Sequence, residues 1–428
     1  MQLTERHIIT KNSPYFKEVD DLCFRSKNLY NRANYLIRQT FIETSKEVEA
    51  GVQEHALWLR YYVLDKRVKE EKWEEYKLLP AKVSQQILLL LDKNWNSFFQ
   101  AMKSWKLNPS NFLSRPKLPK YKNKDGRNIL IYTVQALSSK LLKQSIINPS
   151  KTSIKIKTKI SQELIQQVRI IPKLGHYVLE VIYDKVAMPD KDLDINRVAS
   201  CDFGVNNLAA ITFNQLCLNP ILINGRALKS INQYYNKITS YLRSKLPKKV
   251  FLSKKIIKLL NRREFKISNY LHHVSKFIVE TCVKNTIGTL VLGKNINWKQ
   301  ESDVGKQNNQ NFLSIPHDKL IKQIVYKAKL LGIKIILQEE SYTSKASFVD
   351  KDDIPIYGSE NGKVSFSGRR VKGKRGLYKT KLGVLINSDV NGSLNILKKA
   401  IPKAFDKVYG IGVFVVNPHK INLCKQFI

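Results

Sequence analysis

The chain has 428 residues, 43% of them hydrophobic, which is enough to bury the cores of two or three folded units. Its 74 Lys and Arg outnumber 35 Asp and Glu and leave a formal net charge of +39. A chain this basic repels itself unless a polyanion neutralises it, so nucleic acid is the expected partner. Residues 1–130 hold only 24 basic and 15 acidic side chains, so the rest of the chain should carry most of the phosphate-contacting surface.

The sequence also argues against a membrane-spanning helix and a structural zinc site. No run of about 18 apolar residues occurs, which excludes a helix that spans a membrane. The five cysteines lie far apart and none forms a CxxC pair, so the sequence predicts no structural zinc site. Isolated thiols in a chain without a recognisable signal peptide favour a reducing cytoplasm.

The first part of the chain is predicted to contain one strand followed by helices. Residues 1–10 alternate loosely in polarity, as a strand does, and residues 14–105 have helical periodicity. Between residues 83 and 102 the apolar side chains form a stripe that favours core packing: Ile87, Leu88, Leu91, Trp95, Phe98 and Phe99.

Prolines interrupt the helical pattern at residues 115–122, which read Arg-Pro-Lys-Leu-Pro-Lys-Tyr-Lys. Proline breaks a regular helix, so this basic stretch is predicted to be extended. It suits contact with a nucleic-acid backbone, although a plain linker has the same pattern. Residues 131–187 turn to short runs rich in β-branched side chains, of which 177–183 is the clearest strand, and predict a small β-barrel or sheet.

A polar linker at residues 190–194 precedes a second pattern, in which strands come first and then alternate with helices. The predicted strands are residues 197–205, 208–213, 221–223, 289–293 and 333–338. The predicted helices are residues 228–247, 254–285, 316–331 and 386–399, and residues 341–382 are polar and Gly-rich without strong periodicity. Three hairpin-joined strands followed by strands alternating with helices predict an α/β fold with a mixed sheet, of the ribonuclease-H-like type.

Two aspartates stand where these elements end or begin. Asp202 closes an apolar strand before a Gly turn, and Asp389 lies where the last helix begins. A buried carboxylate at such a place costs several kcal/mol unless it is paired or bound to metal. Taken alone, Asp202 could be a turn aspartate and Asp389 a helix N-cap. A two-metal nuclease would instead need acids from separate elements to converge, because divalent ions such as Mg²⁺ prefer carboxylate oxygens.

The motifs around both aspartates resemble the TnpB (OrfB) family encoded by insertion sequences. Asp-Phe-Gly-Val-Asn-Asn-Leu-Ala at residues 202–209 is similar to the family's first RuvC motif, and Asp-Val-Asn-Gly-Ser-Leu-Asn-Ile at residues 389–396 to its third. Shorter matches lie at residues 115–122, 224–226, 229–237, 293–295, 298–300 and 340–345. The resemblance covers nearly the whole chain. It implies an RNA-guided, metal-dependent DNA endonuclease associated with a transposable element.

The resemblance also implies a division into domains. Residues 1–13 would be the first strand of a wedge β-barrel, residues 14–130 a helical recognition lobe, and residues 131–195 the rest of the barrel. The RuvC nuclease domain would comprise residues 196–340 and 383–405. Residues 341–382 would form an insertion that binds target nucleic acid, and residues 406–428 a C-terminal tail.

The chain departs from the family's pattern at two places. The family has a Glu at the strand end where this chain has Gly293, and a four-Cys zinc motif in the insertion, where this chain has Ser347 and no CxxC. The best-placed substitute for the lost acid is Glu340, at the end of the next strand, because adjacent strands lie about 4.8 Å apart. Side chains alternate along a strand, so only one of Glu339 and Glu340 should face the site, and we favour Glu340.

The expected catalytic and metal-binding residues are therefore Asp202, Glu340 and Asp389, with Mg²⁺ or Mn²⁺ as cofactor and no zinc. The expected partners are a guide RNA and double-stranded target DNA, bound by a monomer in the bacterial cytoplasm at the nucleoid. The candidate nucleic-acid contacts are Arg115, Lys117, Lys120, Tyr121, Lys122, Arg226, Lys229, Asn232, Lys237, Trp298, Lys299, Arg369 and Arg370. Two alternatives stay open: a nuclease-dead RNA-guided DNA-binding protein or repressor, and a transposase that joins strands.

Overall fold

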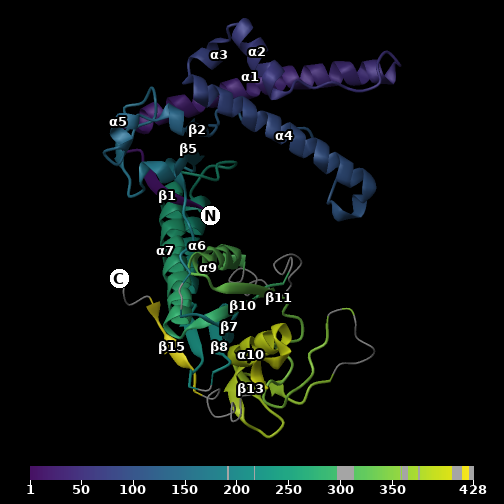
Figure 1. Ribbon diagram of the computed structural model, residues 1–428, viewed down its shortest axis with the longest axis vertical. Helices are drawn as coiled ribbons and strands as arrows, with labels where there is room; N and C mark the ends of the chain where they lie inside the picture. Colours follow the sequence, from purple (N-terminus) through teal and green to yellow (C-terminus); the bar gives the residue numbers. More distant parts are fainter. Residues whose placement is uncertain are drawn as a thin grey trace. The chain divides into compact units, whose positions relative to one another are not determined.

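A computed structural model describes residues 1–189, 192–215, 217–295, 313–356, 358, 365–374, 376–406 and 417–423. The chain divides into two compact units, Met1–Lys185 and Val186–Ile428. Figure 1 colours both units along the sequence. None of the described helices is long and apolar enough to cross a membrane.

The helices of the first unit are α1 (Phe16–Glu49), α2 (Tyr61–Glu70), α3 (Glu74–Lys77) and α4 (Ala81–Leu107). They confirm most of the predicted helical region; residues 50–60, 71–73 and 78–80, which connect the four helices, are not helical. The apolar stripe of α4 is buried through Trp95, whose indole nitrogen donates a hydrogen bond of 3.1 Å to the amide oxygen of Asn34 on α1. Phe98 and Phe99, which continue the stripe, are only half-buried.

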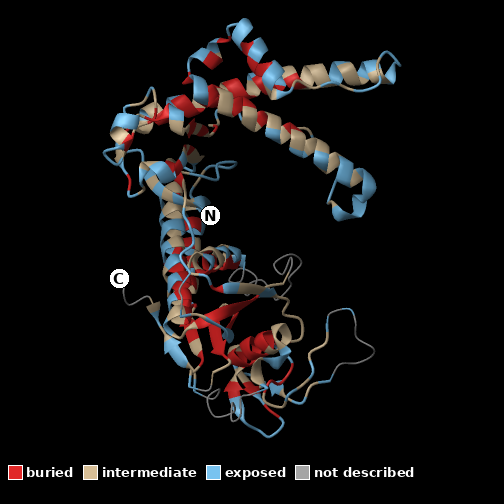
Figure 2. Cartoon of the chain, in the orientation of Figure 1, coloured by how far each residue is buried: buried red, intermediate tan, exposed pale blue. Residues whose placement is uncertain are grey.

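The strands of the first unit form an antiparallel sheet in the order β1 (Gln2–Ile9), β6 (His176–Asp184), β5 (Ile165–Lys173) and β2 (Leu130–Thr133). The two-residue strands β3 (Ile146–Ile147) and β4 (Ile156–Lys157) pair separately, and the short helix α5 (Ser139–Leu142) precedes them. Within residues 1–185, β1 and β2 are the sheet's two edges, so the strands form an open sheet where we expected a small barrel or sheet. Buried residues of the sheet and of α1 and α4 share one core. Figure 2 colours buried residues of the chain red.

The second unit is built on a six-stranded mixed sheet. Its order is β11 (Lys334–Gln338), β10 (Ile287–Gly293), β7 (Asp194–Asp202), β8 (Asn207–Phe213), β9 (Ile221–Asn224) and β15 (His419–Ile421). Strands β7, β8 and β9, which come first along the chain in this unit, pair antiparallel. Strand β10 then pairs parallel with β7, and β11 pairs parallel with β10. This order and these directions confirm the ribonuclease-H-like sheet.

Helices cover both faces of this sheet, which explains why β8 and β10 are almost continuously buried. The helices α7 (Lys254–Lys284) and α9 (His317–Leu330) pack against one face through the core that contains Ala199, Cys201 and Leu290. The helix α10 (Ser388–Ala400) packs on the other, against Val198 and Val291. The helix α6 (Arg226–Ser244) packs beside α7 (Figure 1).

Two segments form strands that the sequence pattern did not predict. The polar, Gly-rich stretch contains β12 (Arg369–Arg370) and β13 (Leu377–Lys379), which pair with β14 (Leu385–Asn387) just before α10. The stretch expected to be a C-terminal tail contributes β15, which pairs parallel with β9 at the edge of the central sheet. Strands of two or three residues are too short to show an alternating pattern.

Candidate active site

Three acidic side chains lie on the same face of the central sheet, toward α10. Side chains alternate along a strand, so Asp202 at the end of β7 shares the face of Val198, which packs with α10. Gly293 at the end of β10 shares the face of Val291 in the same way. Asp389 lies in the first turn of α10 itself, and Glu340 comes two residues after β11.

Asp202 is enclosed between its strand and α10. Burial raises the pKa of its carboxyl above the ordinary range, the nearby charge of Asp389 raises it further, and the charge of Arg370 opposes the shift. The close approach of the helix depends on Gly392, because a Cβ atom there would lie 2.8 Å from Oδ2 of Asp202. The carboxylate is therefore held in a narrow space that any larger residue at position 392 would occupy.

A buried cluster of three hydroxyl groups seats α10 on the sheet. Oγ of Ser200 on β7 lies 2.7 Å from the hydroxyl oxygen of Thr212 on β8, and it donates a hydrogen bond of 2.7 Å to the backbone oxygen of Ser393 on α10. The hydroxyls of Thr212 and Ser393 lie 2.9 Å apart. Because buried hydroxyls need partners, the cluster favours one position of the helix and so places Asp389 relative to Asp202.

The N-cap of α10 is Asn387, whose side-chain oxygen accepts hydrogen bonds from the backbone nitrogens of Asp389 and Val390. The carboxylate of Asp389 is therefore not needed as the cap. Its Oδ2 accepts a hydrogen bond of 2.7 Å from the side-chain amide of Asn207 on β8. A carboxylate in the first helical turn is also favoured by the helix dipole.

Glu340 is largely buried and incompletely paired. Burial raises the pKa of its carboxyl above the ordinary range, and the charges of Asp202 and Glu339 raise it further. Its Oε2 accepts a long hydrogen bond of 3.3 Å from Asn295, whereas its buried Oε1 has no hydrogen-bond partner among the described residues. An unpaired buried carboxylate oxygen is costly, and a cation or a donor from a ligand would satisfy it.

Glu339 has a different environment. Its carboxylate accepts a hydrogen bond of 2.7 Å from Nζ of Lys399 on α10, and the backbone nitrogen of Ser341 donates to it as well. Partial burial opposes ionisation, yet these hydrogen bonds keep the pKa of Glu339 below its usual value. Its charge is thus already neutralised within the protein, in contrast to that of Glu340.

The carboxylate of Glu340 occupies the space that a side chain at position 293 would fill. A Cβ atom built on Gly293 would meet Oε1 of Glu340 closer than any real contact, and would lie 3.0 Å from its Cδ and 2.8 Å from Cδ1 of Ile396. Gly293 pairs with Gln338 across the parallel strands β10 and β11, so an acid just beyond Gln338 reaches the same place. The glycine and the neighbouring glutamate are therefore spatially complementary.

The residues present fit a hard divalent cation in part. Burial and a neighbouring carboxylate raise the pKa of both Asp202 and Glu340, and one oxygen of Glu340 lacks a hydrogen-bond partner among the described residues, which is a donor set that Mg²⁺ or Mn²⁺ would stabilise. Within the described part of the chain, however, no three His, Cys, Asp or Glu side chains are grouped so that they could hold a metal ion. Mg²⁺ is usually held by one or two carboxylates together with water and substrate phosphates, so a looser acidic cluster still suits it.

A polar cleft of about 570 Å³ opens beside Asp389. Its lining combines asparagines with basic side chains that come from three different segments: Asn206, Asn207, Asn224, Arg226, Arg370 and Lys420. Lys229, on α6 behind this lining, donates a hydrogen bond of 2.9 Å to the side chain of Asn206. The cleft thus offers positive charge and amide groups next to an acid, a combination that suits a phosphodiester.

The other candidate contact residues have varied positions. Arg115, Lys117 and Lys120 line a pocket in the first unit, and Tyr121 is exposed with the guanidinium of Arg38 over its ring. Lys122, Lys237 and Arg369 are exposed.

The prediction that Asn232 contacts nucleic acid is wrong. The residue is 2% exposed, accepts a hydrogen bond from Arg263 and donates to Ser314, so its amide serves packing between helices. Trp298 and Lys299 lie outside the described residues.

Several residues that shape the site were not predicted as site residues, although they lie within the motifs that carry the family resemblance. Asn207, Asn295 and Gly392 contact the acids, yet neutral polar residues and glycines are common in loops and turns. The importance of Gly293 and Gly392 could have been recognised only by knowing which side chains approach them.

The order and directions of the strands define a ribonuclease-H-like α/β fold. The family model OrfB_IS605, described as a probable transposase, matches residues 178–299, and that of the Cas12f1-like TNB domain matches residues 317–396. A TnpB-like protein of Acidianus two-tailed virus is 22% identical over 458 residues, covering 92% of this chain and 86% of the relative. The chain is therefore similar to TnpB-like proteins over most of its length.

Two CRISPR-associated proteins are also similar. The CRISPR-associated endodeoxyribonuclease Cas12f1 of Sulfoacidibacillus thermotolerans is 25% identical over 295 residues, covering 61% of this chain and 63% of the relative. A structure of a Cas12f1–sgRNA–target DNA complex has 17% identity and a TM-score of 0.37, covering 94% of this chain and 100% of that one.

Proposed function

We propose that the protein is an RNA-guided DNA endonuclease that hydrolyses phosphodiester bonds with two divalent metal ions, and that Asp202, Glu340 and Asp389 are its catalytic acids. The observation that carries this proposal is the placement of Glu340. Its carboxylate fills the space beside Gly293, where the family has an acid, and it lies close enough to Asp202 for the charge of Asp202 to raise the pKa of Glu340. The similarity to a named endodeoxyribonuclease supports DNA as the substrate.

In this proposal Asp202 and Glu340 would hold metal from the buried side of the site, and Asp389, oriented by Asn207, from the side of the cleft. Bound Mg²⁺ or Mn²⁺ would supply Lewis-acid stabilisation of the charge that develops on the phosphodiester oxygens. Arg226, Arg370 and Lys420 would bind phosphates of the substrate strand in the cleft. The two carboxyls with raised pKa would ionise fully once metal is present.

The experiment is a plasmid-cleavage assay with the protein, its guide RNA and Mg²⁺. Asp202→Asn and Glu340→Gln should each abolish cutting while RNA affinity stays unchanged. Glu339→Gln is the matched control, because it removes the adjacent carboxylate that is paired with Lys399, and it should cut at nearly the wild-type rate. Normal cutting by Asp202→Asn would refute the assignment, and normal cutting by Glu340→Gln with loss in Glu339→Gln would exchange the two glutamates.

A second candidate function is RNA-guided DNA binding without cleavage, as in a repressor. It is favoured by Gly293 and by the lack, within the described residues, of a closed group of metal ligands. Wild-type protein that binds target DNA with its guide RNA, yet leaves the plasmid intact at any Mg²⁺ or Mn²⁺ concentration, would establish it. Joined rather than cut strands in the same assay would instead identify a strand-transferring transposase.

The remaining assignments are also proposals. They include the division into a recognition lobe, a wedge, a RuvC domain and an insertion, the monomeric state on RNA, and a place at the nucleoid in the cytoplasm.

A further inference from the structure

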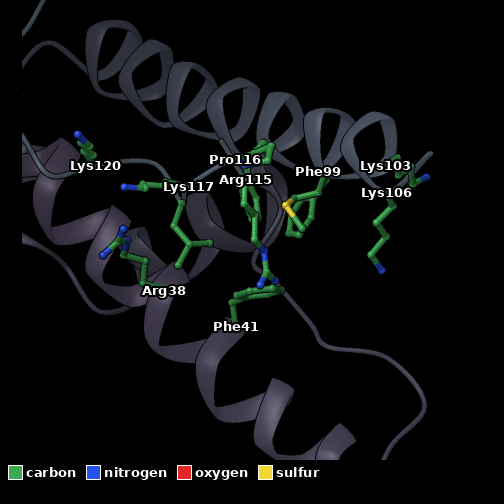
Figure 3. Close-up of a pocket in the computed structure, with 12 residues that line it drawn as sticks. Arg38, Phe41, Phe99, Lys103, Lys106, Arg115, Pro116, Lys117 and Lys120 are labelled. Atoms are coloured by element: carbon green, nitrogen blue, oxygen red, sulfur yellow. The ribbon is translucent and has the colours of Figure 1, made fainter. Parts of the chain in front are cut away.

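A second cavity lies wholly within the first unit, away from the acids in sequence. It has a volume of about 720 Å³, within the range of roughly 300–1,000 Å³ that ligand pockets have, and it lies between α1, α4 and the extended segment at residues 115–120. Figure 3 shows this pocket, with the two helices on either side of its lining side chains. Its centre is apolar and is formed by Phe41, Phe98, Phe99 and Met102.

These aromatic rings are the outer end of a larger cluster. Phe99 lies 5.9 Å from the ring centre of Trp95, which is fully buried, and 5.5 Å from that of Phe41. Phe41, Phe98 and Phe99 are themselves only half-buried. The inner rings of the cluster are therefore core, whereas the outer rings leave an apolar surface open that a planar ligand could cover.

The rim of the same pocket is strongly basic. Six cationic side chains line it and no acidic side chain does: Arg38, Lys103, Lys106, Arg115, Lys117 and Lys120. In Figure 3 the lysine side chains point outward from the apolar centre. Nε of Arg38 is buried and has no hydrogen-bond partner among the described residues. A ligand in the pocket that carries a hydrogen-bond acceptor would pair this donor.

An apolar aromatic centre inside a ring of cations matches one kind of ligand, an unstacked base flanked by its phosphates. We propose that this pocket binds an unpaired nucleotide of the guide RNA, with the base against Phe99 and Phe41 and the neighbouring phosphates on Lys103, Lys106 and Arg115. This inference rests on the proposed function, which supplies the RNA. An acidic peptide would match the rim but has no planar group for the aromatic centre.

RNA is favoured over DNA by the lifetime of the interaction. Exposure of an apolar aromatic surface to water is unfavourable, so a partner that remains bound keeps the surface buried for longer than a partner that dissociates. In the proposed function the guide RNA is the resident partner and the target DNA is transient. Base stacking on an aromatic ring is tolerant of sequence, which suits an RNA whose guide portion varies.

The experiment measures binding of the full-length protein to its guide RNA without DNA. Phe99→Leu keeps apolar volume in the cluster but removes the ring, and should weaken binding on the order of 10-fold. Tyr62→Ala removes an exposed aromatic ring on α2 that does not line the pocket, and should leave affinity unchanged. Wild-type affinity in Phe99→Leu would overturn the proposed stacking.

A second pair of variants does not disturb the aromatic cluster. The double change Lys103→Gln and Lys106→Gln should weaken RNA binding and reduce the slope of log affinity against log salt by about 0.7 for each phosphate that is no longer neutralised. Lys82→Gln with Lys93→Gln is the matched control, because these two exposed lysines lie on the same helix outside the pocket. Equal effects of the two pairs would mean that the helix attracts RNA only through its general charge, and would overturn the pocket.

Crosslinking then identifies the occupant. Guide RNA that carries 4-thiouridine should crosslink on irradiation to a peptide containing residues 98–102, and Phe99→Leu should reduce the yield. A crosslink formed only by single-stranded or target DNA would overturn RNA as the occupant. Failure of this inference is distinguishable from failure of the proposed function: protein that cuts DNA while pocket variants bind RNA normally disproves the pocket alone, and protein that binds RNA through the pocket but never cuts disproves the nuclease alone.

Discussion

Replacing Gly293 with alanine is the perturbation that most directly tests the arrangement of acids. The added Cβ atom would lie closer to Oε1 of Glu340 than real contacts allow and 3.0 Å from its Cδ atom. Carbon atoms in contact normally lie about 3.5–4.0 Å apart, so the carboxylate must retreat by about 0.5–1 Å. A misplacement of about 1 Å at a reacting centre costs on the order of 10²-fold in rate, and we expect Gly293→Ala to cut DNA about that much more slowly.

The assay is single-turnover plasmid cleavage with guide RNA and Mg²⁺, paired with thermal denaturation. The alanine would also lie 2.8 Å from Cδ1 of Ile396, so part of its effect on stability comes from apolar overpacking of about 1–3 kcal/mol. The double variant Gly293→Ala, Ile396→Val removes that methyl group and should regain stability without regaining cleavage. Ile396→Val alone should cut normally and lose about 0.5–1.5 kcal/mol of stability.

Two outcomes decide the reasoning. If Gly293→Ala cuts at the wild-type rate while folded, Glu340 does not serve the site from the position that the structure shows. If Gly293→Glu restores cutting to Glu340→Ala, the two positions supply the same carboxylate from adjacent strands, as the shared space implies.

Four further predictions concern the acids, their neighbours and the bound partners. Folding raises the pKa of Asp202 and Glu340, so the folded state binds more protons than the unfolded state and metal-free protein should lose stability as the pH rises from about 4 toward and beyond neutrality. Thermal denaturation in EDTA should show this loss, Asp202→Asn should reduce it, and a stability that rises over this range would contradict the shifts. Asn207→Ala removes the hydrogen bond to Asp389 and should slow cutting about 10-fold without changing RNA affinity, whereas Asn214→Ala, just beyond the other end of the same strand, should not. Elemental analysis of purified protein should find no stoichiometric zinc, because the sequence has no CxxC pair, and one zinc per chain would contradict this prediction. RNA affinity should fall steeply with salt, in proportion to the phosphates neutralised, and a flat dependence would contradict the role assigned to the charge.

Much of the architecture was predictable because it depends on local pattern. Apolar runs and helical periodicity predicted five of the six strands of the central sheet and the helices α6, α7, α9 and α10 in the right order, and the order itself implied the mixed sheet. The alternation of side chains predicted that only one of Glu339 and Glu340 would face the site; in the structure the charge of Asp202 acts on Glu340, while Glu339 pairs with Lys399. The catalytic roles of these residues remain predictions.

What local pattern could not predict depends on residues distant in sequence. Asn232 has the sequence context of a surface residue, yet Arg263 and Ser314 bury its amide. Residues 419–421 have no strand signal of their own and become β15 only because β9 offers a free edge.

The sequence by itself predicted a polyanion as the partner, a ribonuclease-H-like sheet, and acids at the ends of the strands and helices. Only the tertiary structure decided which groups surround those acids. The lack of a side chain at Gly392 allows Asp202 to lie against α10, and the lack of one at Gly293 leaves space for the carboxylate of Glu340. Asn207 orients Asp389 through a hydrogen bond. The physical reason is that strand and helix formation follow the polarity of near neighbours in the chain, whereas the space around a buried carboxylate is set by close packing between elements that are up to about 190 residues apart.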